Sequence, residues 1–136
     1  MADSLNFSTG EVFTFVNSLT PLSVVSGMVA IGLEKNGALV AGVVYEGINR
    51  FNAWMHVAAA PGARWLTRPY LRACFGYPFQ TCGVERVRGY VSASNMAARR
   101  FDEHLGFEQE AVLHGAAADG SDVIIYVMPK ARCKYV

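Results

Sequence analysis

Hydrophobic positions near the N-terminus follow the repeat of a helix. Apolar residues recur at helical intervals over residues 9–20, and Pro21 follows them. Ser8 and Glu11 have the three-residue spacing of a capping box, in which two side chains satisfy free backbone N–H groups of the first turn. The pattern therefore predicts a first helix near residues 9–20 that begins with such a box.

The next segment alternates between apolar runs and turn residues. Two runs, MVAIGLE and ALVAGVVYEG, flank the tetrapeptide KNGA between Met28 and Gly47. Asn-Gly is a strong hairpin signal because both turn residues must accept a positive φ angle. A third apolar run, NAWMHVAAA at residues 52–60, follows the connection GINRF. These runs predict three strands in an antiparallel meander.

A proline interrupts the helical pattern that comes next. The segment PGARWLTRPYLRACFGYPF has apolar residues at helical spacing but holds Pro69 inside it. Proline removes a backbone donor and clashes with the preceding turn unless it lies in the first turn of a helix. The helix therefore either begins near Thr67 or is kinked at Pro69, and the pattern does not choose between these alternatives.

The C-terminal half predicts a strand, a helix and two closing strands. Residues 85–93 alternate as a strand does, and a helix follows over residues 95–105 with Gly106 in the left-handed capping position. The runs FEQEAVLHG and DVIIYVMP predict two strands joined by the turn AAADGS. The order of elements predicts an α+β fold, a largely antiparallel sheet with a βαβ unit over about residues 85–113.

Composition narrows the class of protein. The 136 residues suit one domain, 1–136, and a chain with 52% hydrophobic and 17% charged residues is expected to fold. The 12 Lys+Arg and 11 Asp+Glu leave a net charge of +1, which provides no basic field to attract nucleic acid. The N-terminus lacks the pattern of a secretory signal, and charged residues interrupt every apolar window before the length of a membrane span.

The cysteines point to a reducing compartment. Cys74, Cys82 and Cys133 include no C-x-x-C pair. An odd and sparse set argues against both a disulfide framework and a zinc site. We therefore expect a soluble cytoplasmic protein with no bound metal.

The order of elements, together with the segment SNMAARRFDEHLGFEQEAVL, resembles the GNAT superfamily of acyl-CoA-dependent N-acetyltransferases. Its members commonly show an Asn at the start of the fourth helix, a small residue three positions on, and a Leu-Gly-Phe exit into a strand that carries a glutamate. The matching positions here are Asn95, Ala98, Leu105, Gly106, Phe107 and Glu110. The segments WLTRPYLRACFGYPF and DVIIYVMPKARC further resemble a short subgroup of phage and bacterial acetyltransferase-like proteins. The resemblance covers roughly residues 28–132.

The resemblance implies a GNAT-like mixed sheet flanked by helices, with the fourth and fifth strands splayed around acetyl-CoA. In this family the fourth strand bonds the pantetheine arm, and the following loop and helix start bind the pyrophosphate. The positions that match the cofactor-binding residues are Met55, Val57, Gly62, Ala63, Arg64, Trp65, Leu66, Thr67, Asn95, Ala98 and Phe101.

The phosphate-binding loop departs from the family pattern. The segment PGARWLTR keeps one glycine of the usual motif, and Trp65 occupies part of it. Without the resemblance, Gly62 is an ordinary turn glycine and Arg64 a solvated surface residue. Asn95 has two compatible roles, since asparagine is also a preferred helix N-cap.

His56 is the candidate general base, because the unperturbed pKa of histidine lies close to neutral pH. The alternative is a packed strand histidine bonded to backbone. Glu46, at the end of the hairpin, is the second candidate, and it is equally well explained as a surface charge.

A second departure concerns the general acid. The family often places a tyrosine four residues before the glycine of the Gly-Phe exit, where it protonates the departing thiolate. Asp102 stands at that position here. An ionised aspartate has no proton to donate and repels a thiolate, so we expect another group or water to supply the proton.

These features predict an acetyl-CoA-dependent N-acetyltransferase in which an amine attacks the thioester directly. The alternative is a catalytically weak or inactive module of the same fold, of the phage type, that docks on a host protein in the host cytoplasm. The partners that these interpretations allow are a small-molecule or protein amine, a host protein and a second copy of the chain.

Overall fold

The computed structural model describes residues 3–136, which form seven strands and three α-helices. The strands are β1 (Ser4–Asn6), β2 (Val29–Lys35), β3 (Ala38–Glu46), β4 (Asn52–Ala59), β5 (Arg86–Ser92), β6 (Glu108–Leu113) and β7 (Val123–Pro129). The helices are α1 (Thr9–Leu19), α2 (Arg68–Gly76) and α3 (Met96–Leu105). A π-helical turn at Tyr77–Thr81 extends α2, and a 3₁₀ turn at Lys130–Arg132 follows β7.

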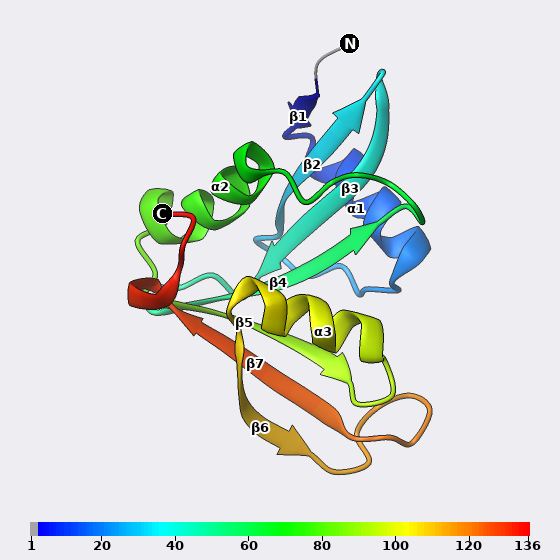
Figure 1. Cartoon of the computed structure of the whole chain (residues 1–136), viewed down its shortest axis with the longest axis vertical. Helices are drawn as coiled ribbons and strands as arrows, with labels where there is room; N and C mark the ends of the chain where they lie inside the picture. The colour runs from blue at the N-terminus through cyan, green and yellow to red at the C-terminus, as the bar shows by residue number, and fades with distance from the viewer. Residues whose placement is uncertain (1–2) are drawn as a thin grey trace.

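All seven strands belong to one sheet in the order β1-β2-β3-β4-β5-β7-β6. Within residues 3–136 every neighbouring pair is antiparallel except β4 and β5, which are parallel. The predicted α+β fold with a mixed, mostly antiparallel sheet is confirmed. Figure 1 shows α2 and α3 in front of the sheet and α1 behind it.

The predicted βαβ unit needs a correction. β5, α3 and β6 follow one another in the chain, but β7 lies between β5 and β6 in the sheet. Because β7 pairs antiparallel with both neighbours, β5 and β6 run in the same direction without pairing with each other. The final strand inserts between them because its apolar residues on the α3 side, Ile124, Tyr126 and Met128, are buried in the core, whereas β6 is exposed along its length.

The first helix forms where it is predicted, but its cap differs. Ser8 is the N-cap residue, yet its side chain makes no capping bond. The Glu11 carboxylate accepts a hydrogen bond from the Asn6 amide instead, at 3.0 Å, and Asn6 Oδ1 accepts from the Ser8 N–H at 2.8 Å. Asn6 lies on β1, a three-residue strand that the sequence pattern does not predict.

Two strand glycines allow α1 to approach the sheet closely. Val12 and Val16 of α1 are fully buried. A Cβ built at Gly42 would lie 2.7 Å from Val16 Cγ2, and one built at Gly32 would lie 2.8 Å from Val12 Cγ2. Both distances are shorter than real carbon contacts, so these positions require glycine.

The hairpin turn and the start of α2 answer two questions posed by the sequence. Asn36 and Gly37 both have positive φ angles, 53° and 79°, as the predicted Asn-Gly turn requires. The start of α2 decides between the two alternatives for Pro69. α2 begins at Arg68, immediately after Thr67, so Pro69 lies in the first turn and does not kink the helix. Thr67 Oγ1 caps the helix by accepting from the Tyr70 N–H at 3.4 Å.

Buried tyrosines fix α2 on the sheet. The Tyr70 hydroxyl donates to the Ile31 carbonyl at 2.9 Å, and the Tyr45 hydroxyl donates to the Cys74 carbonyl at 2.5 Å. Both hydroxyls therefore have acceptors inside the larger core, between the sheet and α2 and α3. No helix of the described chain is long and apolar enough to cross a membrane.

Candidate functional site

The site begins where β4 and β5 separate. The two strands pair only at Asn52–Trp54 with Arg86–Arg88. A Cβ built at Gly89 would still lie 3.4 Å from the Met55 carbonyl oxygen, and beyond this point no further residues of the two strands pair in the part of the chain that the structure describes. The predicted splay of the fourth and fifth strands is therefore present.

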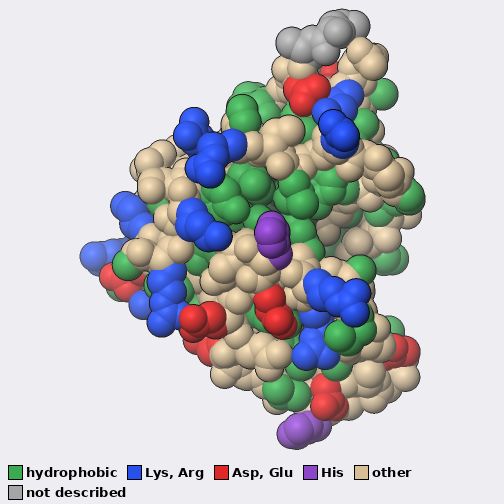
Figure 2. All heavy atoms as spheres, viewed as in Figure 1, with side chains coloured by type: hydrophobic (Ala, Val, Ile, Leu, Met, Phe, Trp, Pro, Cys, Tyr) green, Lys and Arg blue, Asp and Glu red, His purple; other side chains and the backbone are tan. Residues whose placement is uncertain are grey.

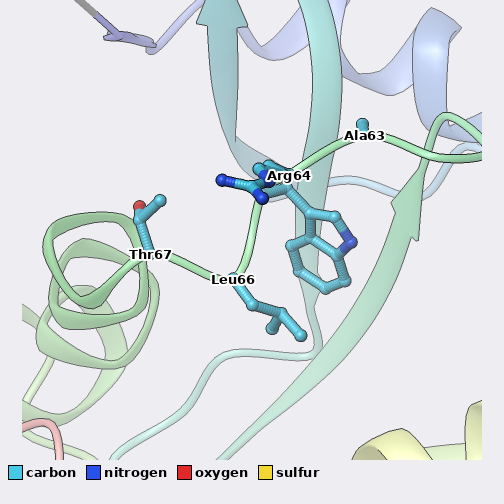
Figure 3. Close-up of a pocket in the computed structure, with 5 residues that line it drawn as sticks. Ala63, Arg64, Leu66 and Thr67 are labelled. Atoms are coloured by element: carbon cyan, nitrogen blue, oxygen red, sulfur yellow. The ribbon is translucent and has the colours of Figure 1, made fainter.

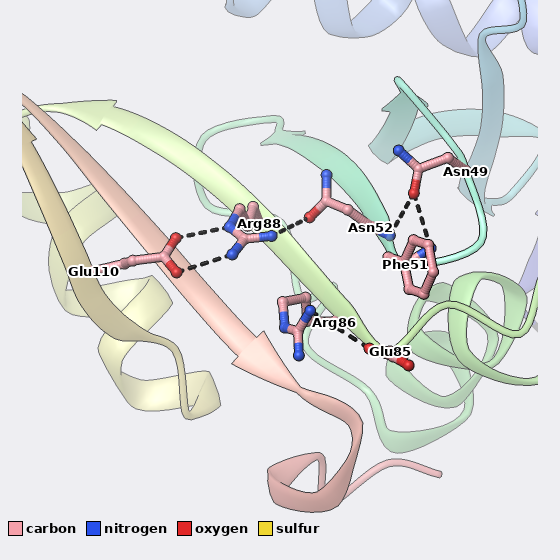
Figure 4. Close-up of polar contacts among 7 residues, drawn as sticks. All are labelled: Asn49, Phe51, Asn52, Glu85, Arg86, Arg88 and Glu110. Carbon is pink, nitrogen blue, oxygen red and sulfur yellow. Dashed lines mark hydrogen bonds and ion pairs between the residues drawn. The ribbon is translucent and has the colours of Figure 1, made fainter.

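A polar cluster closes the paired end of this opening (Figure 4). The Arg88 guanidinium donates to both carboxylate oxygens of Glu110 on β6, at 2.7 and 2.9 Å, and to Asn52 Oδ1 on β4 at 2.8 Å. Arg88 thus ties β4, β5 and β6 together. Its hydrogen bonds hold the pKa of Glu110 below its usual value.

A cavity of about 530 Å³ occupies the opening. One helix of its wall, α3, contributes side chains at positions i, i+3, i+4 and i+7, which lie on one face of a helix. These residues are Ala98, Phe101, Asp102 and Leu105. Other parts of its wall include Met55, His56, Val57, Trp65, Cys74, Gly89, Tyr90, Asn95, Ala116, Ala117 and Ala118. On the front face of the molecule, hydrophobic side chains gather between α2 and α3, with Lys and Arg side chains around them (Figure 2).

The two candidate catalytic residues form a pair on neighbouring strands. His56 Nε2 lies 2.9 Å from Glu46 Oε2, and the His56 side chain is 5% exposed. Burial lowers the pKa of His56, and the Glu46 carboxylate opposes this change. The imidazole is therefore neutral at pH 7. Where His56 Nε2 donates the hydrogen of this bond to Glu46, the lone pair of Nδ1 is free to accept a proton.

The alternatives for both residues do not match this geometry. The partner of His56 is a carboxylate rather than a backbone group. Glu46 is partly covered, with 25% of its side chain exposed, rather than a free surface charge. Their catalytic roles stay predictions.

Tyr90 is a member of the site that sequence reasoning missed. Its ring contacts His56 edge to face, with ring centroids 5.1 Å apart, and it also contacts Trp54. Burial raises the pKa of Tyr90, and the charge of Glu46 raises it further. The available signal was Gly89, because a glycine inside a strand marks a close backbone approach.

Asp102 is one of the residues that line the cavity. Burial, and then the neighbouring Glu103, raise the pKa of its carboxyl to about 7. Near neutral pH a large fraction of the molecules therefore carries a protonated Asp102. A protonated Asp102 has a proton to donate, and the identity of the proton donor stays a prediction.

The loop that leads into α2 forms a second, smaller hollow of about 290 Å³ (Figure 3). Its lining runs along the chain through Ala63, Arg64, Trp65, Leu66 and Thr67. Gly62 has a φ of 76°, but a Cβ built on it would meet nothing within 4 Å. Its backbone conformation, and not a close approach, therefore requires glycine. The Trp65 ring packs on Phe101 of α3, with centroids 5.0 Å apart.

The start of α2 offers little to a phosphate by itself. Among the first three helical residues, Pro69 has no N–H and the N–H of Tyr70 bonds to Thr67. Only the N–H of Arg68 is left in this turn. Phosphate binding here would therefore depend on loop N–H groups and on arginine side chains, of which α2 carries Arg68 and Arg72.

The start of α3 and the β6–β7 loop are joined. Asn95 Oδ1 accepts from the Ala98 N–H at 3.1 Å, so the predicted N-cap is confirmed. The Ser94 hydroxyl donates to Asp119 Oδ2 at 2.7 Å. This bond holds the loop whose three alanines, 116–118, line the cavity. The sequence pattern gives only a polar turn at this loop.

Among the residues that the structure describes, no group of three or more His, Cys, Asp or Glu side chains is placed to hold a metal ion. All three cysteines are free thiols. Burial raises the pKa of Cys74 to about 12, so the one cysteine in the cavity wall is an inert thiol at neutral pH.

No family model matches the chain, and no curated protein matches its sequence. Solved structures do match its fold. A point mutant of the spermidine N-acetyltransferase SpeG from Vibrio cholerae has a TM-score of 0.79 and 16% identity, over 98% of this chain and 96% of that chain. The dodecameric form of the Vibrio cholerae enzyme, in an intermediate state, has a TM-score of 0.77 and 16% identity, over 95% and 94%.

A chimera of SpeG and hSSAT is similar as well, with a TM-score of 0.77 and 14% identity over 96% of this chain and 98% of that chain. At these identities the likeness shows the fold alone. The chain has the GNAT fold, which confirms the architecture implied by the sequence resemblance. The comparisons do not support the phage-like subgroup or a host-protein partner.

Proposed function

We propose that the protein is an acetyl-CoA-dependent N-acetyltransferase that transfers an acetyl group directly to an amine. The observation that carries this proposal is the opening between β4 and β5, which contains a cavity of about 530 Å³ with a neutral histidine in its wall. Likeness to solved acetyltransferases along nearly the whole chain supports it.

The coenzyme arm fits the unpaired edge of β4. Beyond Trp54 the backbone of β4 has no strand partner on the β5 side, so an amide-rich pantetheine arm can bond to Met55 and Val57 as an added strand. Ala98 and Phe101 of α3 would form the opposite wall, and Asn95 would lie at the helix start. The pyrophosphate would contact the loop from Gly62 to Thr67, with Arg64 as its charge partner.

The pair of His56 and Glu46 supplies the base. An amine is protonated at neutral pH and must lose a proton before its nitrogen can attack the thioester carbon. His56 Nδ1 would accept this proton, while Glu46 holds the ring in the required tautomer through Nε2. Backbone N–H groups of the open strand edge are the available donors for the oxyanion.

Several finer statements belong to the same proposal. The free thiols Cys74, Cys82 and Cys133 suit a reducing cytoplasm. A homo-oligomer is a reasonable assembly, since the similar Vibrio cholerae enzyme forms a dodecamer. The competing interpretation, an inactive module that docks on a host protein, would depend on surface aromatic residues rather than on His56.

An amine screen with acetyl-CoA, read by release of free coenzyme thiol, tests the proposal. We expect turnover with at least one primary amine, and we expect His56→Ala to reduce it at least 100-fold. His104→Ala, which changes an exposed histidine of α3, is the matched control and should keep full activity. A His56→Ala protein with wild-type activity would show that His56 is not the base. No turnover with any amine would favour the docking module.

A further inference from the structure

We propose that Asp102 is the general acid of this reaction and delivers a proton to the coenzyme sulfur as the thioester breaks. This inference rests on the proposed function and assigns a proton donor to the same site. Asp102 stands four residues before Gly106, where the family usually has a tyrosine that donates this proton. The proton must therefore come from another group or from water.

The first support is where Asp102 lies. It belongs to the face of α3 that lines the cavity, between Phe101 and Leu105. Of all the residues that line this cavity, Asp102 is the single Asp, Glu, Lys or Arg. A carboxyl group in such a wall costs free energy unless it has a use or a partner.

The second support is the lack of a structural partner. In the part of the chain that the structure describes, no hydrogen bond or ion pair involves the Asp102 carboxyl. Its neighbour Glu103 behaves differently, because it accepts a hydrogen bond from the Tyr126 hydroxyl at 2.6 Å. Glu103 therefore has a structural role, and the Asp102 side chain has none that the fold explains.

The third support is the opposite wall. His56 from β4 and Tyr90 from β5 line the same cavity as Asp102 from α3. A thioester lying in the opening would have a proton acceptor on the strand side and a carboxyl on the helix side. This arrangement suits a reaction in which nitrogen loses a proton and sulfur gains one.

The surroundings of the Asp102 carboxyl favour its protonated form. Glu103 is its neighbour on α3, and the titratable residues that line the same cavity are Cys74 on α2, His56 on β4 and Tyr90 on β5. None of these is a cation at pH 7, since His56 and the Cys74 thiol are neutral. Burial raises the pKa of Asp102 to about 7, with Glu103 adding to the effect. A bound pantetheine arm would displace water and raise it further.

The proton transfers balance. His56 first takes one proton from the ammonium, and the free amine attacks the thioester carbon to give a tetrahedral intermediate with an oxyanion and a positively charged nitrogen. The C–S bond then breaks, and the departing sulfur takes the proton of the Asp102 carboxyl. The Asp102 carboxylate regains a proton from the amide nitrogen. His56 finally releases its proton to solvent, so the net products are the amide, the free thiol and one proton.

This assignment has a distinctive pH signature. The reaction needs neutral His56 and protonated Asp102, so the rate should rise with pH through the pKa of His56 and fall above the pKa of Asp102. A tyrosine in the same place, with an unperturbed pKa near 10, would keep its proton to a much higher pH. The falling limb therefore reports on which residue donates.

The test measures single-turnover rates from pH 5 to 10 for the wild type, Asp102→Asn and Asp102→Tyr, with acetyl-CoA affinity measured for each. We expect Asp102→Asn to bind acetyl-CoA within about threefold of the wild type, to react roughly 100-fold more slowly and to lose the falling limb. Asp102→Tyr should restore most of the rate and move the falling limb upward by more than one pH unit.

Other outcomes overturn the assignment. An Asp102→Asn protein with the wild-type rate and pH profile would show that Asp102 donates no proton. A slower Asp102→Asn protein that keeps the wild-type falling limb would show a structural role only. If Tyr90→Phe, and not Asp102→Asn, removes the falling limb, the donor is Tyr90. A wild-type protein that transfers no acetyl group to any amine would contradict the proposed function itself, and the assignment with it.

Discussion

His56 and Glu46 form a hydrogen-bonded pair across neighbouring strands, with Nε2 and Oε2 2.9 Å apart. Glu46 lies opposite Trp54, and His56 is two residues farther along β4, opposite Val44. Side chains opposite each other or two residues apart share a face of the sheet. Val44 packs in one buried cluster with Val12 and Val16 of α1, so the pair lies on the α1 side of the sheet. The coenzyme would approach from the α2 and α3 side, and the acceptor amine from the other.

This pairing predicts the effect of Glu46→Gln. Glu46 raises the pKa of His56 by its charge and its hydrogen bond, so its loss should lower that pKa. We expect kcat/KM to fall roughly 10-fold or more because the ring loses its fixed tautomer, and the rising limb of the pH profile to move to lower pH. Glu85→Gln, at an exposed residue, is the control. A rising limb that stays in place would show that Glu46 does not influence the base.

Asp102 should make folding stability depend on pH. Its pKa is raised to about 7 in the folded protein, above the ordinary 3.8 of an unfolded chain. Between these two pKa values the folded state binds more protons than the unfolded state. The free energy of unfolding therefore falls as the pH rises from 3.8 to 7, by at most about 1.4 kcal/mol per pH unit.

Asp102→Asn removes this titration. Urea unfolding at pH 4 and pH 8 should therefore show the variant gaining stability relative to the wild type at the higher pH. An equal difference between the two proteins at both pH values would contradict the raised pKa.

Close packing of α1 on the sheet predicts a cost for Gly42→Ala. The added methyl would lie 2.7 and 2.9 Å from carbons of Val16 and Val12, which are themselves fully buried. We expect a loss of about 1–3 kcal/mol in the free energy of unfolding. Gly10→Ala is the matched control, because nothing lies within 4 Å of its Cβ and alanine favours a helix. A Gly42→Ala protein as stable as the wild type would show that α1 shifts freely.

The Ser94–Asp119 hydrogen bond predicts a selective effect on the acceptor. Ser94→Ala should free the loop whose alanines line the cavity and raise KM for the amine several-fold, since the loop must then be ordered on binding. The affinity for acetyl-CoA should stay the same. Ser18→Ala, on the exposed end of α1, serves as control. An unchanged KM would show that the loop does not contact the acceptor.

Local signals explain which parts of the fold could be predicted. The Asn36-Gly37 turn, the Asn95 cap and the Gly106 cap each depend on a few adjacent residues, and all three form as predicted. The insertion of β7 between β5 and β6 depends on contacts between distant segments, which periodicity does not report. β1 is three residues long, too short for an alternating pattern to mark it.

Some residues of the candidate site could likewise be predicted from the sequence, and others could not. Some of the positions matched by resemblance, such as Met55, Val57 and Phe101, lie in the cavity wall. The loop positions Ala63, Arg64, Leu66 and Thr67 line the smaller hollow instead, and Gly62 lines neither. Tyr90 was missed because its contact with His56 exists only after β4 and β5 come together. The protonation of Asp102 depends on its burial, and a residue's burial cannot be read from its type.

Calorimetric titration with acetyl-CoA tests the coenzyme site most directly, and Ala98→Phe sharpens the measurement by filling the cavity wall on α3. Ala97→Phe, on the exposed side of the same helix, is its control. We predict micromolar binding, about 8 kcal/mol, for the wild type and Ala97→Phe, with similar affinity for desulfo-CoA, and a loss of binding for Ala98→Phe. No heat and no thermal stabilisation of the wild type at millimolar acetyl-CoA would contradict a coenzyme site between β4 and β5.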